Sequence, residues 1–279
     1  MSVFNSLIDQ SQVVSILKEA VTSANSAGDL SQAMTNTWLF TGPAGSGRSN
    51  AAIAFAAALV CKDGGCSKCQ DCLSTILGAH ADVELIKTQG LSIKIDEVRE
   101  LISRASWAPS VANFRVVVIE DADRLTDSAA NALLKVIEEP GLRTIWLLCA
   151  PTLTDVLPTI RSRCRHLALR TPSTKAITNL LIERDQIDTK TAEFVARASG
   201  GHIGRARRLA TDLNTRQSRE KILKLPLMIK DVSSAYKAAQ FLVDSAKAEA
   251  VADAEKKDED EISKLKEAWG STGSKMVTG

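Results

Sequence analysis

The chain has 279 residues, of which 44% are hydrophobic and 24% are charged, and these values indicate a soluble globular protein of about two domains. Its net charge of +2 is too small to predict nucleic-acid binding by itself. The N-terminus lacks a basic segment followed by an apolar run, and the longest apolar stretch, 51–61, is shorter than the roughly 20 residues that cross a bilayer, so we expect a cytoplasmic protein without a membrane partner.

The first part of the chain alternates between patterns typical of helices and of strands. Helix-like spacing of apolar residues occurs at 13–21, 49–60, 95–106 and 126–139. Short apolar runs typical of buried strands occur at 37–42, 81–87, 114–123 and 144–150. This alternation favours an α/β fold with a mostly parallel sheet and helices on both of its faces, and we predict that this domain covers residues 1–170.

After residue 170 the strand patterns stop. Helical patterns, separated by polar or glycine-containing breaks, indicate a small helical domain over 171–232. The segment 233–279 continues with helical spacing and becomes very rich in charged residues. It then ends in a polar tail that we expect to be disordered.

A glycine-rich loop lies between the strand at 37–42 and the helix at 49–60. The stretch GPAGSGRS has the spacing of a P-loop, in which glycines let backbone N–H groups converge on phosphate oxygens at the start of a helix. Ser49 would reach Mg²⁺, and Arg48 takes the place of the usual lysine with a larger, forked cation. The alternative is a glycine-rich turn that binds no ligand. The candidate nucleotide-binding residues of the loop are Gly42, Pro43, Gly45, Gly47, Arg48 and Ser49.

Two adjacent acids end the buried strand at 114–123. ATPases of this type usually carry an Asp for the metal, followed by a Glu that orients the attacking water, whereas here Glu120 precedes Asp121. The shorter Asp121 would hold water about 1.5 Å from the useful place, and such a displacement is costly in catalysis. Alternatively, the two acids only cap the strand and solvate the loop. We therefore predict a degenerate site for ATP and Mg²⁺.

Four cysteines directly follow the P-loop helix. Cys61, Cys66, Cys69 and Cys72 lie within twelve residues, and Gly64-Gly65 lets the chain turn among them. Four thiolates at this spacing can close a tetrahedral Zn²⁺ site, and no further ligand position is evident, so we predict a structural zinc module at 61–72. The alternatives are free thiols or disulfides, the latter being rare in the cytosol. We expect Cys149 and Cys164 to be core or turn residues.

Together these segments resemble the bacterial DNA polymerase III clamp-loader subunits of the AAA+ class, over about residues 3–230. The opening stretch FNSLIDQSQVVSILKEAV is similar to the adenine-side box of that family, with Asp9 where a glycine is common. The other segments that carry the resemblance are the zinc module, the helix NALLKVIEEP at 131–140, the Ser-Arg-Cys motif at 162–164, and GGHIGRARRL at 200–209.

The resemblance implies that 171–232 is a lid domain and that 233–279 starts a helical collar domain, which oligomerises the ring in this family. Because the chain ends at Gly279, we expect the collar to be truncated. The tau/gamma subunits of the family keep the P-loop lysine and the Asp-Glu order, whereas delta prime subunits tend to lose both and keep Ser-Arg-Cys. This chain is therefore similar to delta prime, and we expect little or no ATPase activity of its own.

The same resemblance implies a role for two arginines. In the family, ATP lies between neighbouring subunits, and Arg163 would act in trans on the ATP of a tau/gamma neighbour, where such an arginine can contribute ~10³–10⁵ in rate. Alternatively, Arg163 pairs with a local carboxylate. Arg205 would touch the γ-phosphate in its own subunit or, in an idle site, hold the lid or face solvent. The expected partners are tau/gamma, delta and, through the complex, the sliding clamp and primer-template DNA.

Two other functions stay open at this stage. One is an active tau/gamma-like clamp-loader ATPase, in which Arg48 does the work of the lysine and the chain hydrolyses ATP itself. The other is a zinc-bearing DNA-repair ATPase that acts outside replication. Nucleotide affinity and turnover of the isolated chain separate the first from an assembly subunit, and co-purification with clamp-loader subunits separates the second.

Overall fold

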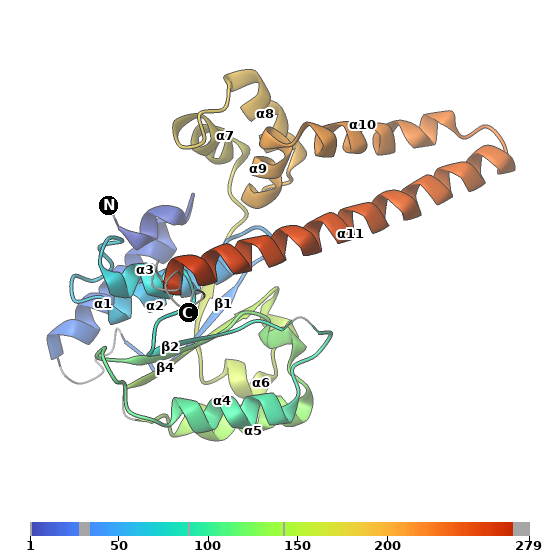
Figure 1. Ribbon diagram of the computed structural model, residues 1–279. Coiled ribbons are helices and arrows are strands. Elements are labelled where there is room, and N and C mark those ends of the chain that lie inside the picture. The colour runs from blue at the N-terminus through green and yellow to red at the C-terminus, as the bar shows by residue number, and fades with distance from the viewer. Residues whose placement is uncertain (1, 28–33, 89, 142, 270–279) are drawn as a thin grey trace, which may run out of the picture. The chain divides into compact units, whose positions relative to one another are not determined.

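The computed structural model describes residues 2–27, 34–88, 90–141 and 143–269 (Figure 1). The chain divides into two compact units, the first ending at Gly204 and the second beginning at Arg205. The boundaries at residues 170 and 232 that the sequence suggests remain predictions. The polar tail that we expect to be disordered lies outside the described residues.

The first unit contains a five-stranded sheet in the order β2-β3-β4-β1-β5, and all of its pairings are parallel. Its strands are β1 Thr37–Thr41, β2 Val83–Ile86, β3 Arg115–Ile119, β4 Thr144–Ala150 and β5 Arg165–Ala168. Every residue of β1, β3 and β4 is buried, which explains why these strands read as continuous apolar runs in the sequence. The predicted α/β fold with a parallel sheet is confirmed.

Helices cover both faces of this sheet (Figure 1). The helices of the first unit are α1 Ser11–Ala27, α2 Arg48–Val60, α3 Gln70–Ile76, α4 Ile95–Ala105, α5 Asp127–Glu138, α6 Pro158–Arg161, α7 Thr174–Glu183 and α8 Thr189–Ala198, with 3₁₀ turns η1 Val3–Ser6, η2 Ala122–Arg124 and η3 Leu153–Asp155. Trp38 and Phe40 of β1 pack with α1 and α2 on one face, whereas Leu39 packs with α4 and α5 on the other. Successive strand residues point to opposite faces, so one buried strand supplies both halves of the core.

Alanines let α2 lie close to the sheet. Nine of the residues from Ala51 to Val60 are buried, and six of these nine are alanines. Phe55 fills the remaining space with its ring edge against Trp38, at a centroid distance of 5.0 Å. This packing fixes the start of α2, and with it the glycine loop that precedes the helix.

The second unit contains a helical pair. The helix α9 Ile203–Thr211 spans the division between the units, and α10 Leu213–Met228 and α11 Val232–Trp269 follow and pack on each other. Apolar side chains of this pair stay exposed, among them Leu227, Val232 and Tyr236. No helix in the described part of the chain is long and apolar enough to cross a membrane.

Candidate functional site

The glycine loop connects β1 to α2 in a conformation that only glycine adopts easily. Gly45 and Gly47 have positive φ angles of 86° and 85°, and Gly47 serves as the left-handed N-cap of α2. No side chain caps this helix, so backbone N–H groups of its first turn face the loop. The predicted order of strand, glycine loop and helix is therefore present, with a helix N-terminus of the kind that binds phosphate.

Arg48 folds back onto this loop. Its Nη1 donates a hydrogen bond of 2.7 Å to the carbonyl oxygen of Gly42, at the start of the loop. Two polar atoms, Arg48 Nε and Ser46 Oγ, are buried without a hydrogen-bond partner among the described residues. The loop thus keeps unsatisfied donors that an anion could engage, although the guanidinium itself already binds the backbone of the loop.

His202 covers the middle of the loop. A Cβ atom added to Gly45 would lie only 2.6 Å from His202 Cα and 2.8 Å from its Cβ, so the segment before α9 touches the glycine backbone directly. Gln10 supports the loop from another side, since its Nε2 lies 3.5 Å from the oxygen of Ser46 and donates to the oxygen of Arg170 at 2.6 Å. Neither contact could be predicted from the sequence.

The two predicted acids lie at the same edge of the sheet, but a cation of the chain already faces one of them. Lys87 Nζ, just beyond β2, lies 3.4 Å from Glu120 Oε2, and the Glu120 side chain is only 12% exposed. The backbone oxygen of Asp121 accepts the N–H of Arg124 at 3.0 Å in the turn η2, and the Asp121 side chain makes no capping hydrogen bond there. Whether these acids bind a metal or only cap the strand end stays a prediction, and Glu120 forms an ion pair with a residue not singled out in the sequence.

Cys149 marks the point where the loop and the acids meet. Burial, together with the neighbouring charges of Glu120 and Asp121, raises the pKa of this thiol well above its usual range, while Arg48 opposes the shift. Its Sγ lies 3.9 Å from the carbonyl oxygen of Arg48. The residue is a neutral core thiol, as expected.

Asp9, in the opening segment of the chain, adopts a backbone conformation that glycine favours. Asp9 has a left-handed φ of 61°, a conformation that aspartate tolerates better than most residues. Its Oδ2 accepts the N–H of Ser173 at 2.9 Å, and this hydrogen bond holds the pKa of the carboxyl below its usual range. The aspartate thus keeps the backbone turn of a glycine and adds a tie to the start of α7.

Arg163 lies on the surface directly after α6. Its Nε is 2.8 Å from Glu138 Oε1 at the end of α5, and its Nη1 donates to the oxygen of Thr159 at 2.8 Å and to Ser162 Oγ at 3.1 Å. The Arg163 side chain is 41% exposed. The local carboxylate that the sequence left as an alternative partner is therefore present, and the arginine still reaches solvent. Arg205 lies at the start of the second unit.

The four cysteines of the predicted zinc module converge. Their sulfur atoms all lie within 4.8 Å of one another, and Cys61 Sγ and Cys69 Sγ are 3.6 Å apart. With Zn–S bonds of about 2.3 Å, the thiolates of a tetrahedral site lie about 3.8 Å apart, so this donor set fits Zn²⁺. Cys61 ends α2 and Cys69 caps α3, so two helix ends hold the module to the core.

Backbone N–H groups point at the cysteine sulfurs. Those of Cys66, Cys69 and Cys72 donate to the preceding cysteine of the cluster at 3.3–3.5 Å. Hydrogen bonds from the backbone of Lys68 and Cys69 lower the pKa of Cys66 to about 7. Burial raises the pKa of Cys72 above its usual range, so without a cation this thiol stays protonated. A cation would favour the thiolate forms of all four residues.

A buried carboxylate, not singled out in the sequence, lies beside this module. Asp82 precedes β2 and accepts three backbone N–H groups, from Ser110, Val111 and Ala112, at 2.7–2.8 Å, while Arg115 Nη2 lies 3.7 Å away. Although burial raises its pKa, these N–H groups and the Arg115 charge hold it below the usual range. His80 links Asp82 to the zinc module, because its Nδ1 accepts the Asp82 N–H and its Nε2 lies 3.6 Å from Asp71 of α3.

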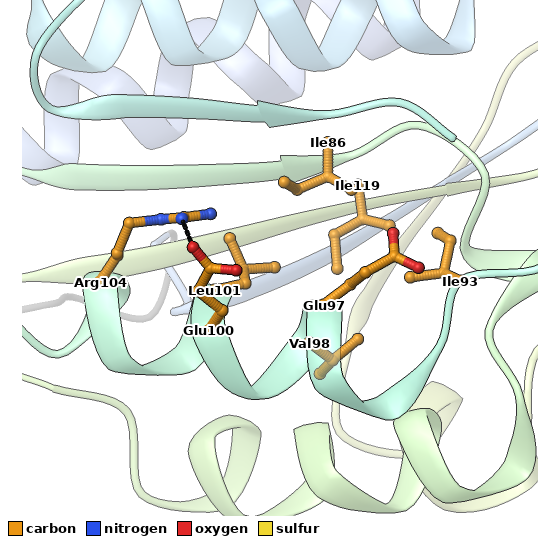
Figure 2. Close-up of a pocket in the computed structure, with 8 residues that line it drawn as sticks. All are labelled: Ile86, Ile93, Glu97, Val98, Glu100, Leu101, Arg104 and Ile119. Carbon is orange, nitrogen blue, oxygen red and sulfur yellow. Dashed lines mark hydrogen bonds and ion pairs between the residues drawn. The ribbon is translucent and has the colours of Figure 1, made fainter. Parts of the chain in front are cut away.

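A small pocket of about 160 Å³ lies away from the glycine loop, between α4 and the edge of the sheet (Figure 2). Five aliphatic side chains and three charged ones line it: Ile86, Ile93, Val98, Leu101, Ile119, Glu97, Glu100 and Arg104. Arg104 pairs with Glu100 at 2.6 Å and also with Glu84 of β2. None of the predicted site residues lines this pocket.

A family model described as DNA polymerase III, delta subunit, matches residues 13–173, which is more than half of the chain. This chain belongs to that family. The delta' subunit of Bacillus subtilis DNA polymerase III is 32% identical over 195 residues, 69% of this chain and 59% of that protein. The delta' subunit of Pseudomonas aeruginosa is 34% identical over 147 residues, 50% of this chain and 45% of that protein. The predicted resemblance to delta prime subunits is confirmed.

Relatives of the other clamp-loader type are also similar. The gamma/tau subunit of Mycobacterium tuberculosis DNA polymerase III is 32% identical over 178 residues, 60% of this chain and 31% of that protein. The chain thus spans less than two thirds of each of these relatives. Among solved structures, the Thermotoga maritima RuvB Holliday junction branch migration motor aligns with a TM-score of 0.54 at 17% identity, over 85% of this chain and 70% of that chain. This likeness shows the fold alone.

Proposed function

We propose that this chain is the delta prime subunit of a bacterial DNA polymerase III clamp loader. In this role it helps to load the sliding clamp on primed DNA and does not hydrolyse ATP itself. The observation that carries the proposal is that charged side chains at the candidate nucleotide site pair within the chain. We call this site, made of the glycine loop 42–49 with Glu120 and Asp121, the nucleotide edge. Arg48 binds the oxygen of Gly42 and Lys87 faces Glu120, so the groups that would hold phosphate and metal already have partners within the chain.

The order of the two acids supports the same conclusion. Hydrolysis needs a carboxylate that orients water beside a metal-bound γ-phosphate. The first acid, Glu120, is engaged by Lys87, and the second, Asp121, is one methylene shorter than the glutamate that would orient the water. A bound nucleotide would place its phosphates at the N–H groups of the glycine loop, with Ser49 and Arg48 nearest to the metal and phosphate charge. In this arrangement the chain can retain a nucleotide without turning it over.

The contribution to ATP chemistry would come from Arg163 acting on a neighbouring gamma/tau subunit. A forked cation that is exposed and oriented on the surface suits the stabilisation of charge on a γ-phosphate from outside. Exposed apolar residues of α10 and α11, such as Leu227 and Val232, support a second contact with other subunits. We take this helical pair as the start of the collar and propose delta as a further partner.

The decisive experiment reconstitutes the complex with gamma/tau and delta subunits, sliding clamp and primed DNA, and compares Arg163→Ala with wild type. Clamp- and DNA-stimulated ATP hydrolysis should fall by on the order of 10³-fold, because charge on the transferred phosphoryl group loses its partner. Arg161→Ala, a change in the same short segment, is the matched control and should leave the rate near the wild-type value. An unchanged rate in Arg163→Ala would exclude the trans role.

A second candidate function is a slow ATPase in its own right. Arg48 Nε and Ser46 Oγ, both buried without partners among the described residues, favour some binding of phosphate. Titration calorimetry of the isolated chain with Mg²⁺ and a non-hydrolysable ATP analogue measures the affinity, and a coupled assay measures turnover. Micromolar binding with no turnover fits a nucleotide-gated assembly subunit, whereas turnover that Arg48→Ala abolishes would establish the ATPase.

Zinc is proposed as the structural metal of the module at 61–72. Four sulfur donors without a further ligand match a closed site, in which the metal holds the fold and has no open position for substrate. The contacts of Arg48, Glu120 and Arg163 described above do not involve this ion. We therefore assign it to stability and to the docking of α3 against α2.

A further inference from the structure

We propose that Glu138 is a positioning residue for Arg163, orienting the guanidinium toward the ATP of the neighbouring subunit; this inference rests on the proposed trans role. Glu138 is the last residue of α5, and Arg163 follows α6, so the two come from neighbouring elements that pack on each other. Their contact, at 2.8 Å between Nε and Oε1, is the only ion pair that Arg163 makes within the described residues.

Two of the three guanidinium nitrogens are held by the chain. Nε faces Glu138, and Nη1 donates to both the oxygen of Thr159 and Ser162 Oγ. The Thr159 carbonyl belongs to α6, where the last carbonyls lack helical partners, so the arginine also caps this short helix. These contacts engage Nε and Nη1, and they leave Nη2 for an acceptor that comes from outside the chain.

The backbone that carries Arg163 is itself fixed. Ile160 of α6 is buried in the cluster formed with α4 and α5, and the Arg163 N–H donates to its oxygen at 3.0 Å. Cys164 Sγ donates to the same oxygen at 3.1 Å, and burial raises the pKa of this thiol to about 12, so it remains a donor at neutral pH. With the backbone fixed, the side chain of Arg163 is the remaining mobile part, and Glu138 restricts it.

The exposure of the pair indicates that Glu138 orients the Arg163 side chain and does not block it. Both side chains are exposed, 41% for Arg163 and 48% for Glu138, and exposed pairs are weak enough for a triphosphate to compete with them. An arginine also loses much rotamer freedom when it is ordered, and Glu138 imposes part of that order before the neighbour arrives. The pair therefore favours a ready conformation without locking the arginine away.

The test uses the full reconstituted complex and measures kcat and KM for ATP in four variants. Glu138→Ala should lower kcat about fivefold with little change in KM for ATP, because the arginine is less often in place. Glu138→Gln should recover most of the rate, since its amide oxygen can still accept from Nε. Glu139→Ala, a change at the adjacent exposed acid, is the matched control and should leave kcat unchanged.

The fourth measurement combines Glu138→Ala with Arg163→Ala. If Glu138 acts through Arg163, the double variant should be no slower than Arg163→Ala alone. A rate that is insensitive to Arg163→Ala would overturn the trans role itself. A rate that depends on Arg163 but not on Glu138 would overturn only the positioning role, and a faster Glu138→Ala complex would show that the acid restrains the arginine instead.

Discussion

The cysteine cluster and the nucleotide edge are both polar sites built on the same helix, one at each end of α2. At its N-terminus, the charges of the nucleotide edge are paired within the chain, with Arg48 on a loop carbonyl and Lys87 beside Glu120. At its C-terminus, four sulfur atoms lie within 4.8 Å of one another, and backbone N–H groups donate to three of them. At the first site Arg48, Lys87 and Glu120 already have partners in the chain, whereas at the second a cation would favour the thiolate forms of all four cysteines.

This difference indicates that the cysteine cluster depends on a bound cation more than the nucleotide edge does. Cys72 stays protonated because it is buried, and a metal is the charge that would make four thiolates tolerable in one place. In the nucleotide edge, Lys87 supplies from the chain a positive charge beside the acid that would otherwise favour Mg²⁺. Loss of the external ion should therefore affect the two ends of α2 very differently.

Removal of a zinc ligand should have the largest effect. Zn²⁺ binding to structural sites carries an apparent free energy on the order of 10 kcal/mol, so Cys72→Ser should lose the metal and strongly destabilise the module. Metal analysis of the purified protein should give about one zinc per wild-type chain and almost none in the variant. Cys164→Ser, which lies outside the cluster, should keep its zinc. Full zinc content in Cys72→Ser would contradict the assignment.

Substitution of Asp82 should have the next largest effect on stability. Asp82 is a buried charge whose partners all belong to the chain itself. Asp82→Asn removes the charge that faces buried Arg115, so we expect a loss of about 3 kcal/mol in the free energy of unfolding at pH 7. Because the folded pKa of Asp82 is lowered, its contribution is present above its unfolded pKa of about 3.9 and is lost as pH falls through the folded value.

Urea unfolding of both proteins at several pH values measures this dependence. The gap between wild type and Asp82→Asn should be widest near neutral pH. It should narrow below about pH 4, where Asp82 of the unfolded chain takes up a proton while the folded carboxyl, with its lowered pKa, is still charged. Asp96→Asn, at an exposed position of α4, is the control and should change stability little at any pH. A gap that stays constant down to pH 2 would mean that the charge of Asp82 does not stabilise the fold.

Lys87→Ala is expected to have the smallest effect and tests the self-pairing directly. Without the lysine, Glu120 should favour a divalent cation, so Mg²⁺ should strengthen binding of the ATP analogue by up to about fivefold more than in the wild type. The gain is small because Lys87 is largely exposed and solvent already screens the pair. Lys94→Ala, at the start of α4, is the control. A Mg²⁺ dependence identical to that of the wild type would show that Lys87 does not compete with the metal.

Much of this fold could be predicted from the sequence, because the sheet is buried on both faces. Continuous apolar runs marked β1, β3 and β4, and an amphipathic pattern marked α4, which covers Ile95–Ala105 against a prediction of 95–106. The run at 114–123 was predicted four residues too long at its end. The strand stops at Ile119, since Glu120 and Asp121 leave the sheet to form an ion pair and a turn.

The candidate site was predicted less completely. The residues of the glycine loop and the four cysteines were found because their spacing along the chain is itself the signal. Lys87, His202 and Glu138 were missed, because each acts on a residue more than 20 positions away in the sequence and no local pattern distinguishes it from an ordinary surface residue.

The sequence by itself determined which groups this protein carries: a glycine loop with an arginine, reversed acids, four clustered cysteines and a Ser-Arg-Cys motif. Only the tertiary structure decided how these groups are paired. Parallel strands bring their carboxyl ends to one edge, so Lys87 meets Glu120 there, and the packing of α5 on α6 brings Glu138 to Arg163. Charges interact through space and not along the chain, so their balance follows from the fold.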